Sequence, residues 1–115
     1  MDPGLFSPFE HAIDRHQDLE WGQILLTPLQ LGAWSLLEPM GLQNHAPQLC
    51  WIRSDVLACV WMAGDQEGTS GMSVVLSLLS AQSGAWSEPQ CISQDAQRSE
   101  QNPLLFVSGG QLHLI

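Results

Sequence analysis

Short apolar runs alternate with turn residues through the middle of the chain, a pattern typical of antiparallel strands. Three runs show it, at residues 48–53, 56–62 and 73–79. A two-residue turn, Ser54-Asp55, separates the first two runs, and a glycine-rich segment, residues 63–71, separates the second from the third. We therefore predict three consecutive antiparallel strands joined by a tight hairpin and a long loop.

The tight turn also predicts which residues face each other across the hairpin. By alternation from the turn, Cys50 lies opposite Cys59 at a non-hydrogen-bonded position, where Cα atoms approach to about 4.5 Å. That spacing permits a disulfide, and two reduced, buried thiols are the alternative. We also expect Trp51 and Trp61 to be more than half buried, because both faces of the sheet should be covered.

The N-terminal third has a different pattern. Residues 7–10 (Ser-Pro-Phe-Glu) combine a capping serine, a proline at the first helical position and a glutamate three residues after the serine. They predict a short helix over about residues 8–19. From Trp21 the periodicity changes, and residues 23–27 and 29–37 are expected to form a hairpin that ends at the turn of residues 38–41.

The C-terminal part begins with a polar, loop-like segment, residues 91–100, and continues with apolar runs at 104–107 and 111–115. Residues 101–103 (Gln-Asn-Pro) stand before a strand, as residues 44–47 (Asn-His-Ala-Pro) do. A second repeat of the same unit is therefore expected to start here. The chain ends on an apolar run, which would leave an exposed sheet edge and suggests a fragment of a longer protein.

Residues 43–115 resemble the sialidase (neuraminidase) family of β-propellers with Asp-box, or BNR, repeats. The motifs are His-Ala-Pro at 45–47, Gly-x-x-Glu-Gly at 64–68 and Gly-x-Trp-Ser-Glu-Pro at 84–89. The resemblance implies an all-β fold: a partial β-propeller with one complete blade plus parts of neighbouring blades. Residues 1–42 would precede it as the short N-terminal helix and a hairpin, which either closes another blade or stays a simple outer hairpin.

The Asp-box of this family, Ser-x-Asp-x-Gly-x-Thr-Trp, is degraded in residues 80–86. Gln82 replaces the aspartate, and one residue fewer separates Gly84 from Trp86. In the family the box is structural, because it folds the turn between the third and fourth strands and its tryptophan packs between blades. We expect the same packing role for Trp86.

The resemblance implies hydrolysis of glycosides, in the manner of an exo-α-sialidase, or carbohydrate binding. Active members hold the substrate carboxylate with arginines at the start of the first strand and after the second, and carry an acid at the third. These positions hold His45, Asp65 and Gly71 here, and the tyrosine nucleophile of sialidases has no counterpart because the chain lacks tyrosine. The chain alone is therefore expected to be inactive on sialosides.

Five residues form the predicted site. Asp65 and Glu67, on the long loop, are the candidate catalytic carboxylates; Asn44, His45 and Asn102, at strand starts, are the candidate substrate-binding residues. In a radial blade these positions share the axial side on which propellers bind ligands. A purely structural role for His45, as a hydrogen-bond partner of the loop, is the alternative. At the level of function, the alternative is a non-catalytic propeller interaction module.

Composition narrows the partners. Three arginines, no lysine and twelve carboxylates give a net charge of −9, which disfavours nucleic acid and anionic membranes as partners. We expect a carbohydrate or another small polar ligand. The three cysteines lack Cys-x-x-Cys spacing, so no metal or other cofactor is expected. No apolar run is long enough to span a membrane, and the first residues do not resemble a signal peptide, which predicts a cytoplasmic location.

Overall fold

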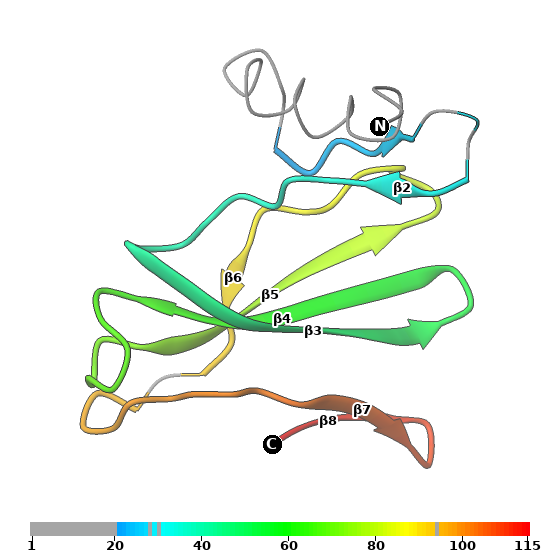
Figure 1. Ribbon diagram of the computed structural model, residues 1–115. Coiled ribbons are helices and arrows are strands. Elements are labelled where there is room, and N and C mark those ends of the chain that lie inside the picture. Colours follow the sequence, from blue (N-terminus) through cyan, green and yellow to red (C-terminus); the bar gives the residue numbers. More distant parts are fainter. Residues whose placement is uncertain (1–20, 28, 30, 94) are drawn as a thin grey trace.

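The computed structural model describes residues 21–115 apart from residues 28, 30 and 94. The helix predicted over residues 8–19 lies outside the described residues. The described part is all-β and contains eight strands (Figure 1). They are β1 (Leu25–Leu26), β2 (Ala33–Trp34), β3 (Gln43–Arg53), β4 (Val56–Gly64), β5 (Ser73–Ser80), β6 (Gln90–Cys91), β7 (Leu105–Ser108) and β8 (Gln111–Leu114).

Strands β3, β4, β5 and β6 form one antiparallel sheet in chain order. The three strands predicted in the middle of the chain are thus confirmed as β3, β4 and β5. The hairpins β1–β2 and β7–β8 are separate two-stranded sheets, and they lie on opposite sides of the four-stranded sheet (Figure 1). The described residues form a single four-stranded, blade-like sheet between two hairpins and do not close into a propeller.

Strand β4 is the centre of the core because it is apolar on both faces, as expected of a strand covered on both sides. Its residues Ala58–Ala63 are each no more than 6% exposed. On one face, here called the Leu105 face, Ala58 and Val60 pack with Val74 and Leu105 of β7. On the other, the Trp61 face, the core members are Cys59, Trp61, Ala63 and Val75, and they pack against Leu37, Met40 and Trp86.

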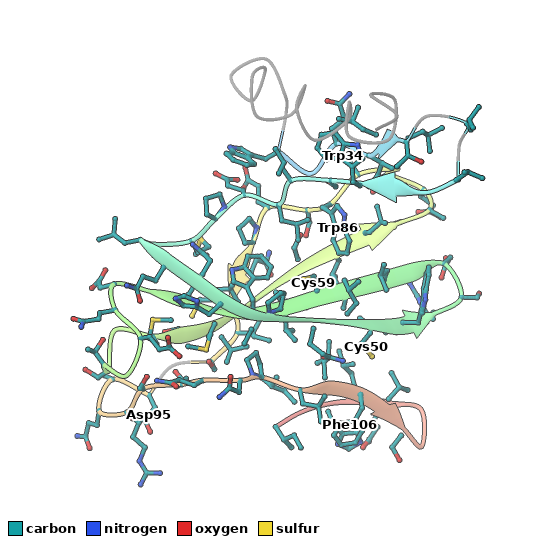
Figure 2. All side chains as sticks on the ribbon, viewed as in Figure 1. Trp34, Cys50, Cys59, Trp86, Asp95 and Phe106 are labelled. Carbon is teal, nitrogen blue, oxygen red and sulfur yellow. The ribbon has the colours of Figure 1, made fainter. Side chains whose placement is uncertain are left out.

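The predicted pairing of Cys50 with Cys59 is wrong. Cys59 lies opposite Leu49, whereas Cys50 lies opposite Ala58. The cause is a register shift near the turn, where β3 carries one residue more than β4, so that every pair beyond the shift moves by one position. Cys50 therefore packs on the Leu105 face and Cys59 on the Trp61 face, and both thiols are free (Figure 2).

The burial predicted for the two tryptophans is correct only for Trp61. Trp61 is 5% exposed, whereas Trp51 is 62% exposed. Both faces of the sheet are covered as expected, but the cover on the Trp61 face is local. Leu37 and Met40 pack against the half of the sheet that contains Trp61 and leave Trp51, near the β3–β4 turn, in contact with solvent.

Candidate functional site

An open cavity of about 250 Å³ lies on the Trp61 face, where the segment before β3 passes over the sheet. Its lining comes from this segment, from the first half of β3 and from the middle of β4. The lining residues are Leu37, Glu38, Pro39, Asn44, His45, Pro47, Cys59 and Trp61. The walls are mainly apolar with a few polar groups, as is usual for sites that bind small molecules.

Asn44 links strand β4 to the segment that precedes β3, the two parts of the chain that enclose this cavity. Its Oδ1 atom accepts a hydrogen bond from the Trp61 indole Nε1–H at 2.9 Å and a second from the Met40 backbone N–H at 3.0 Å. The indole N–H of a buried tryptophan needs such a partner. One side-chain oxygen thus fixes both the tryptophan and the overlying segment, and the cavity is formed before any ligand arrives.

A bulge in β3 shapes the side of the cavity that His45 borders. His45 is paired with Met62 and Gln48 with Val60, so that Ala46 and Pro47 together oppose a single residue of β4. Ala46 adopts a positive φ of 54°, which is uncommon for a residue with a Cβ atom. Pro47 has no N–H to donate to a ladder and is tolerated at such an irregularity. The bulge turns the strand at the point where it meets the cavity.

Cys59 contributes an apolar wall rather than a nucleophile. Burial raises the pKa of the Cys59 thiol, and a backbone hydrogen bond involving Gln48 only partly opposes this shift. A raised pKa keeps the thiol protonated at neutral pH, and the thiolate is the reactive form.

The predicted carboxylates, Asp65 and Glu67, lie in the loop between β4 and β5 and do not border the cavity. The Glu67 backbone N–H donates to Gln43 Oε1 at 2.8 Å, which ties the loop to the first residue of β3. The Asp65 carboxylate lies beside Gly71, because a Cβ placed on Gly71 would be 3.3 Å from Asp65 Oδ2. The loop is therefore folded back on itself next to the start of β3.

Asn102 lies on the segment that leads into β7, with a positive φ of 53°. Its backbone N–H donates to the Sδ atom of Met62, with 3.4 Å between nitrogen and sulfur.

Of the five predicted site residues, the structure places Asn44 and His45 together in one cavity. Asp65 and Glu67 lie on the neighbouring loop, and Asn102 lies outside the lining. Glu38, which borders the cavity, was missed: it precedes Pro39 in what the sequence shows only as a turn.

Among the residues that the structure describes, no arginine or lysine borders the cavity. In the described part of the chain, Arg53 lies 3.6 Å from Asp55 and Arg98 lies 3.9 Å from Asp95, and both arginine side chains are largely exposed. The described residues also contain no group of three or more histidine, cysteine or acidic side chains arranged to hold a metal ion. Nor do the described residues contain a helix long and apolar enough to cross a bilayer. Because the described lining has no arginine or lysine, this cavity lacks a clamp for a ligand carboxylate.

The turn that follows β5 keeps its shape without the aspartate of a full Asp-box. The Gly84 N–H donates to the Ser80 carbonyl at 2.9 Å, with Gly84 at a positive φ of 66°. The Gln82 N–H donates to Ser80 Oγ at 3.1 Å, and Ser83 Oγ donates to the Ser80 carbonyl at 3.2 Å. Serine hydroxyls thus hold the turn, and Trp86 beyond it packs on the Trp61 face of the core. Its predicted packing between blades stays a prediction.

The antiparallel four-stranded sheet and the turn that precedes Trp86 place the described residues among all-β proteins. Residues 55–115, more than half of the chain, match the BNR repeat-like domain family, and the chain belongs to that family. Neither a curated protein nor a solved structure matches the chain.

Proposed function

We propose that residues 43–115 are part of a sialidase-like propeller that binds carbohydrate, and that the cavity at Asn44 and His45 takes a neutral sugar. The observation that carries the proposal is this preformed, mainly apolar cavity in a chain of the BNR repeat-like family. The family membership favours a carbohydrate, and the cavity supplies a place for one.

The cavity lining suits the two kinds of surface on a sugar ring. Leu37, Pro39 and Pro47 offer apolar contacts to the C–H faces, while Glu38 and His45 offer hydrogen-bonding groups to the hydroxyls. An anionic sugar is disfavoured, because the described lining has a carboxylate and no arginine or lysine, and the chain carries a net charge of −9.

Hydrolysis, if the parent protein performs it, would use the loop carboxylates. We propose Asp65 and Glu67 as acid or hydrogen-bond acceptor for a neutral glycoside that extends from the cavity, with Asn102 as a further substrate contact. Glycoside hydrolysis usually needs two carboxyl groups on either side of the scissile bond. Both residues come from the loop between β4 and β5, and the Gln43 contact holds this loop beside β3.

Titration of the chain with neutral methyl hexopyranosides, followed by the indole N–H resonance of Trp61, tests the cavity. We expect weak, millimolar binding to wild type, as ligand efficiencies for small ligands allow, and its loss in His45→Ala. His113→Ala is the matched control, because His113 lies outside the cavity. It stacks on Phe106 in the β7–β8 hairpin, with the two ring centroids 5.0 Å apart. Binding that survives His45→Ala unchanged, or tighter binding of N-acetylneuraminic acid, would contradict the proposal.

The alternative, a non-catalytic interaction module, is favoured by the β7–β8 hairpin. Four of its large apolar side chains are more than a third exposed: Phe106, Val107, Leu112 and Leu114. Exposed apolar groups gathered on one element are typical of protein contacts. If no glycoside perturbs Trp61 or any other resonance, the interaction module becomes the better explanation of this chain.

A further inference from the structure

A second cavity, of about 360 Å³, lies at the opposite end of the same sheet, beside the β3–β4 turn. It shares no residue with the cavity at Asn44 and His45. Four separate segments line it: the residue before β1, the β3–β4 hairpin, the end of β5 and the turn after β5. The lining residues are Ile24, Trp51, Ser54, Asp55, Leu79, Ser80, Ala81 and Gly84.

Trp51 supplies an aromatic surface in this cavity. It is 62% exposed, although the sheet continues beside it with apolar residues. Trp51 pairs with Leu57, and Leu57 pairs with Leu79, so the three side chains stand in one row on the same face. An indole exposed at the end of an apolar row, inside a concave site, offers a flat surface for a ring-shaped ligand.

Polar groups stand around this aromatic surface. The Asp55 side chain is about half exposed and can accept hydrogen bonds from hydroxyl groups. Ser80 Oγ already accepts the Gln82 N–H, which leaves its own O–H hydrogen available as a donor. Acceptor and donor thus lie near the indole, as a ligand with several hydroxyl groups requires.

The cavity is also formed in advance. The Ala81 N–H donates to the Asp55 carbonyl at 3.0 Å, which joins the β3–β4 turn to the turn after β5. The turn after β5 is fixed further by the hydrogen bonds that Ser80 receives from Gln82, Ser83 and Gly84. Little ordering is left for a ligand to impose, and this favours the binding of small molecules.

We propose that this cavity is a second carbohydrate site, in which a neutral pyranose stacks on Trp51 and hydrogen-bonds to Asp55 and Ser80. The C–H face of a pyranose matches the indole, and its hydroxyls match the polar rim. The Asp55 carboxylate and the net charge of −9 disfavour anionic sugars, and Arg53, 3.6 Å from Asp55, offsets only part of this repulsion. The site stands on its own residues, so its existence does not depend on whether the cavity at His45 binds sugar.

Amide and indole chemical shifts of the full chain, titrated with methyl β-glucopyranoside, methyl β-galactopyranoside and methyl α-mannopyranoside, report both cavities in one experiment. We expect at least one of these sugars to shift the Trp51 indole N–H and the amides of Asp55, Ala81 and Gly84. Trp51→Ala should abolish the shifts of the three amides or raise the Kd for the sugar by about tenfold or more. Trp51→Phe keeps an aromatic ring and should bind the sugar more weakly. His45→Ala should leave binding at the second cavity as in the wild type.

Trp21→Phe is the matched control, because Trp21 is also exposed, at 49%, but lies outside both cavities. Asp55→Asn should weaken binding while it relaxes the exclusion of N-acetylneuraminic acid. No shift at Trp51 with any neutral sugar at about 0.1 M, where a millimolar site is filled, would overturn the proposal. So would shifts that persist in Trp51→Ala. A response at Trp61 without one at Trp51 would reject this second site and leave the first standing.

Discussion

The side-chain amide of Gln48 pairs with the backbone of Leu105, 57 residues further along the chain. The Leu105 N–H donates to Gln48 Oε1 at 2.8 Å, and Gln48 Nε2 donates to the Leu105 carbonyl at 3.2 Å. The glutamine thus behaves like the peptide group of a neighbouring strand. It joins the four-stranded sheet to the β7–β8 hairpin where Leu105, 3% exposed, enters the core.

Substitution of Gln48 by alanine should lower the free energy of unfolding by about 1–3 kcal/mol, because it leaves a buried N–H and a buried carbonyl of Leu105 without partners. Denaturant titration measures the change. Gln111→Ala is the control, since Gln111 is an exposed residue of β8, and it should change stability by less than about 0.5 kcal/mol. Equal effects of the two substitutions would show that the Gln48 amide does not stabilise the hairpin contact.

Asn44→Ala should also destabilise the protein by about 1–3 kcal/mol, because the buried Trp61 indole and the Met40 N–H lose a shared acceptor. The fluorescence of Trp61 should shift to longer wavelength as the overlying segment loosens and water reaches the indole. Asn44→Asp keeps an acceptor oxygen and should recover much of the lost stability. Equal losses in the two variants would mean that the acceptor atom is not what matters.

The strands β3, β4 and β5 could be predicted because their signals are local. Turn residues separate the runs, and the continuous apolar run of β4 is typical of a strand buried on both faces. Asn44 and His45 were predicted just before a strand at residues 48–53, whereas β3 already begins at Gln43 and includes them; both border the cavity. Sequence alone does not show whether a segment such as residues 37–40 folds back over the sheet.

The register and the burial of the tryptophans could not be predicted for the same reason. The bulges of β3 depend on what packs above each half of the strand, and an extra residue moves every later pair by one. Trp51 and Trp61 have similar sequence surroundings, yet only Trp61 is covered, by a cluster that includes residues far before and far after it in the chain. Glu38 gave no signal either, because its role depends on this tertiary contact.

The cysteines should remain separate under oxidising conditions, because Cys50 and Cys59 lie on opposite faces of the sheet. Mass spectrometry of the chain treated with oxidised glutathione should find no bond between these two residues. Alkylation in the native state should be fastest at Cys91, which is exposed, and slowest at Cys59, which is 6% exposed. An internal disulfide between Cys50 and Cys59 would contradict the observed register.

The Cys59 thiol should make stability decrease at alkaline pH. Burial raises its pKa in the folded state, so the folded protein holds this proton more tightly than the unfolded chain does. Its contribution is therefore complete below the ordinary thiol pKa of about 8.5 and is lost as pH rises through the folded-state value. Denaturant titrations across this range should show a decline that is smaller in Cys59→Ala. An equal decline in both proteins would assign it to other groups.

The purified chain should not cleave a fluorogenic sialoside, since the described residues of the cavity include no arginine or lysine and the chain lacks a tyrosine nucleophile. Turnover above that of a heat-inactivated sample would contradict this. A single arginine in the cavity, in the variant His45→Arg, separates binding from chemistry, because His45 borders the cavity and Asp65 does not. A guanidinium pairs with a carboxylate through two parallel hydrogen bonds. The variant should therefore bind N-acetylneuraminic acid, detected by chemical shifts at Trp61, and still release no fluorophore. The arginine supplies attraction for the carboxylate, but the chain has no tyrosine to attack the anomeric carbon.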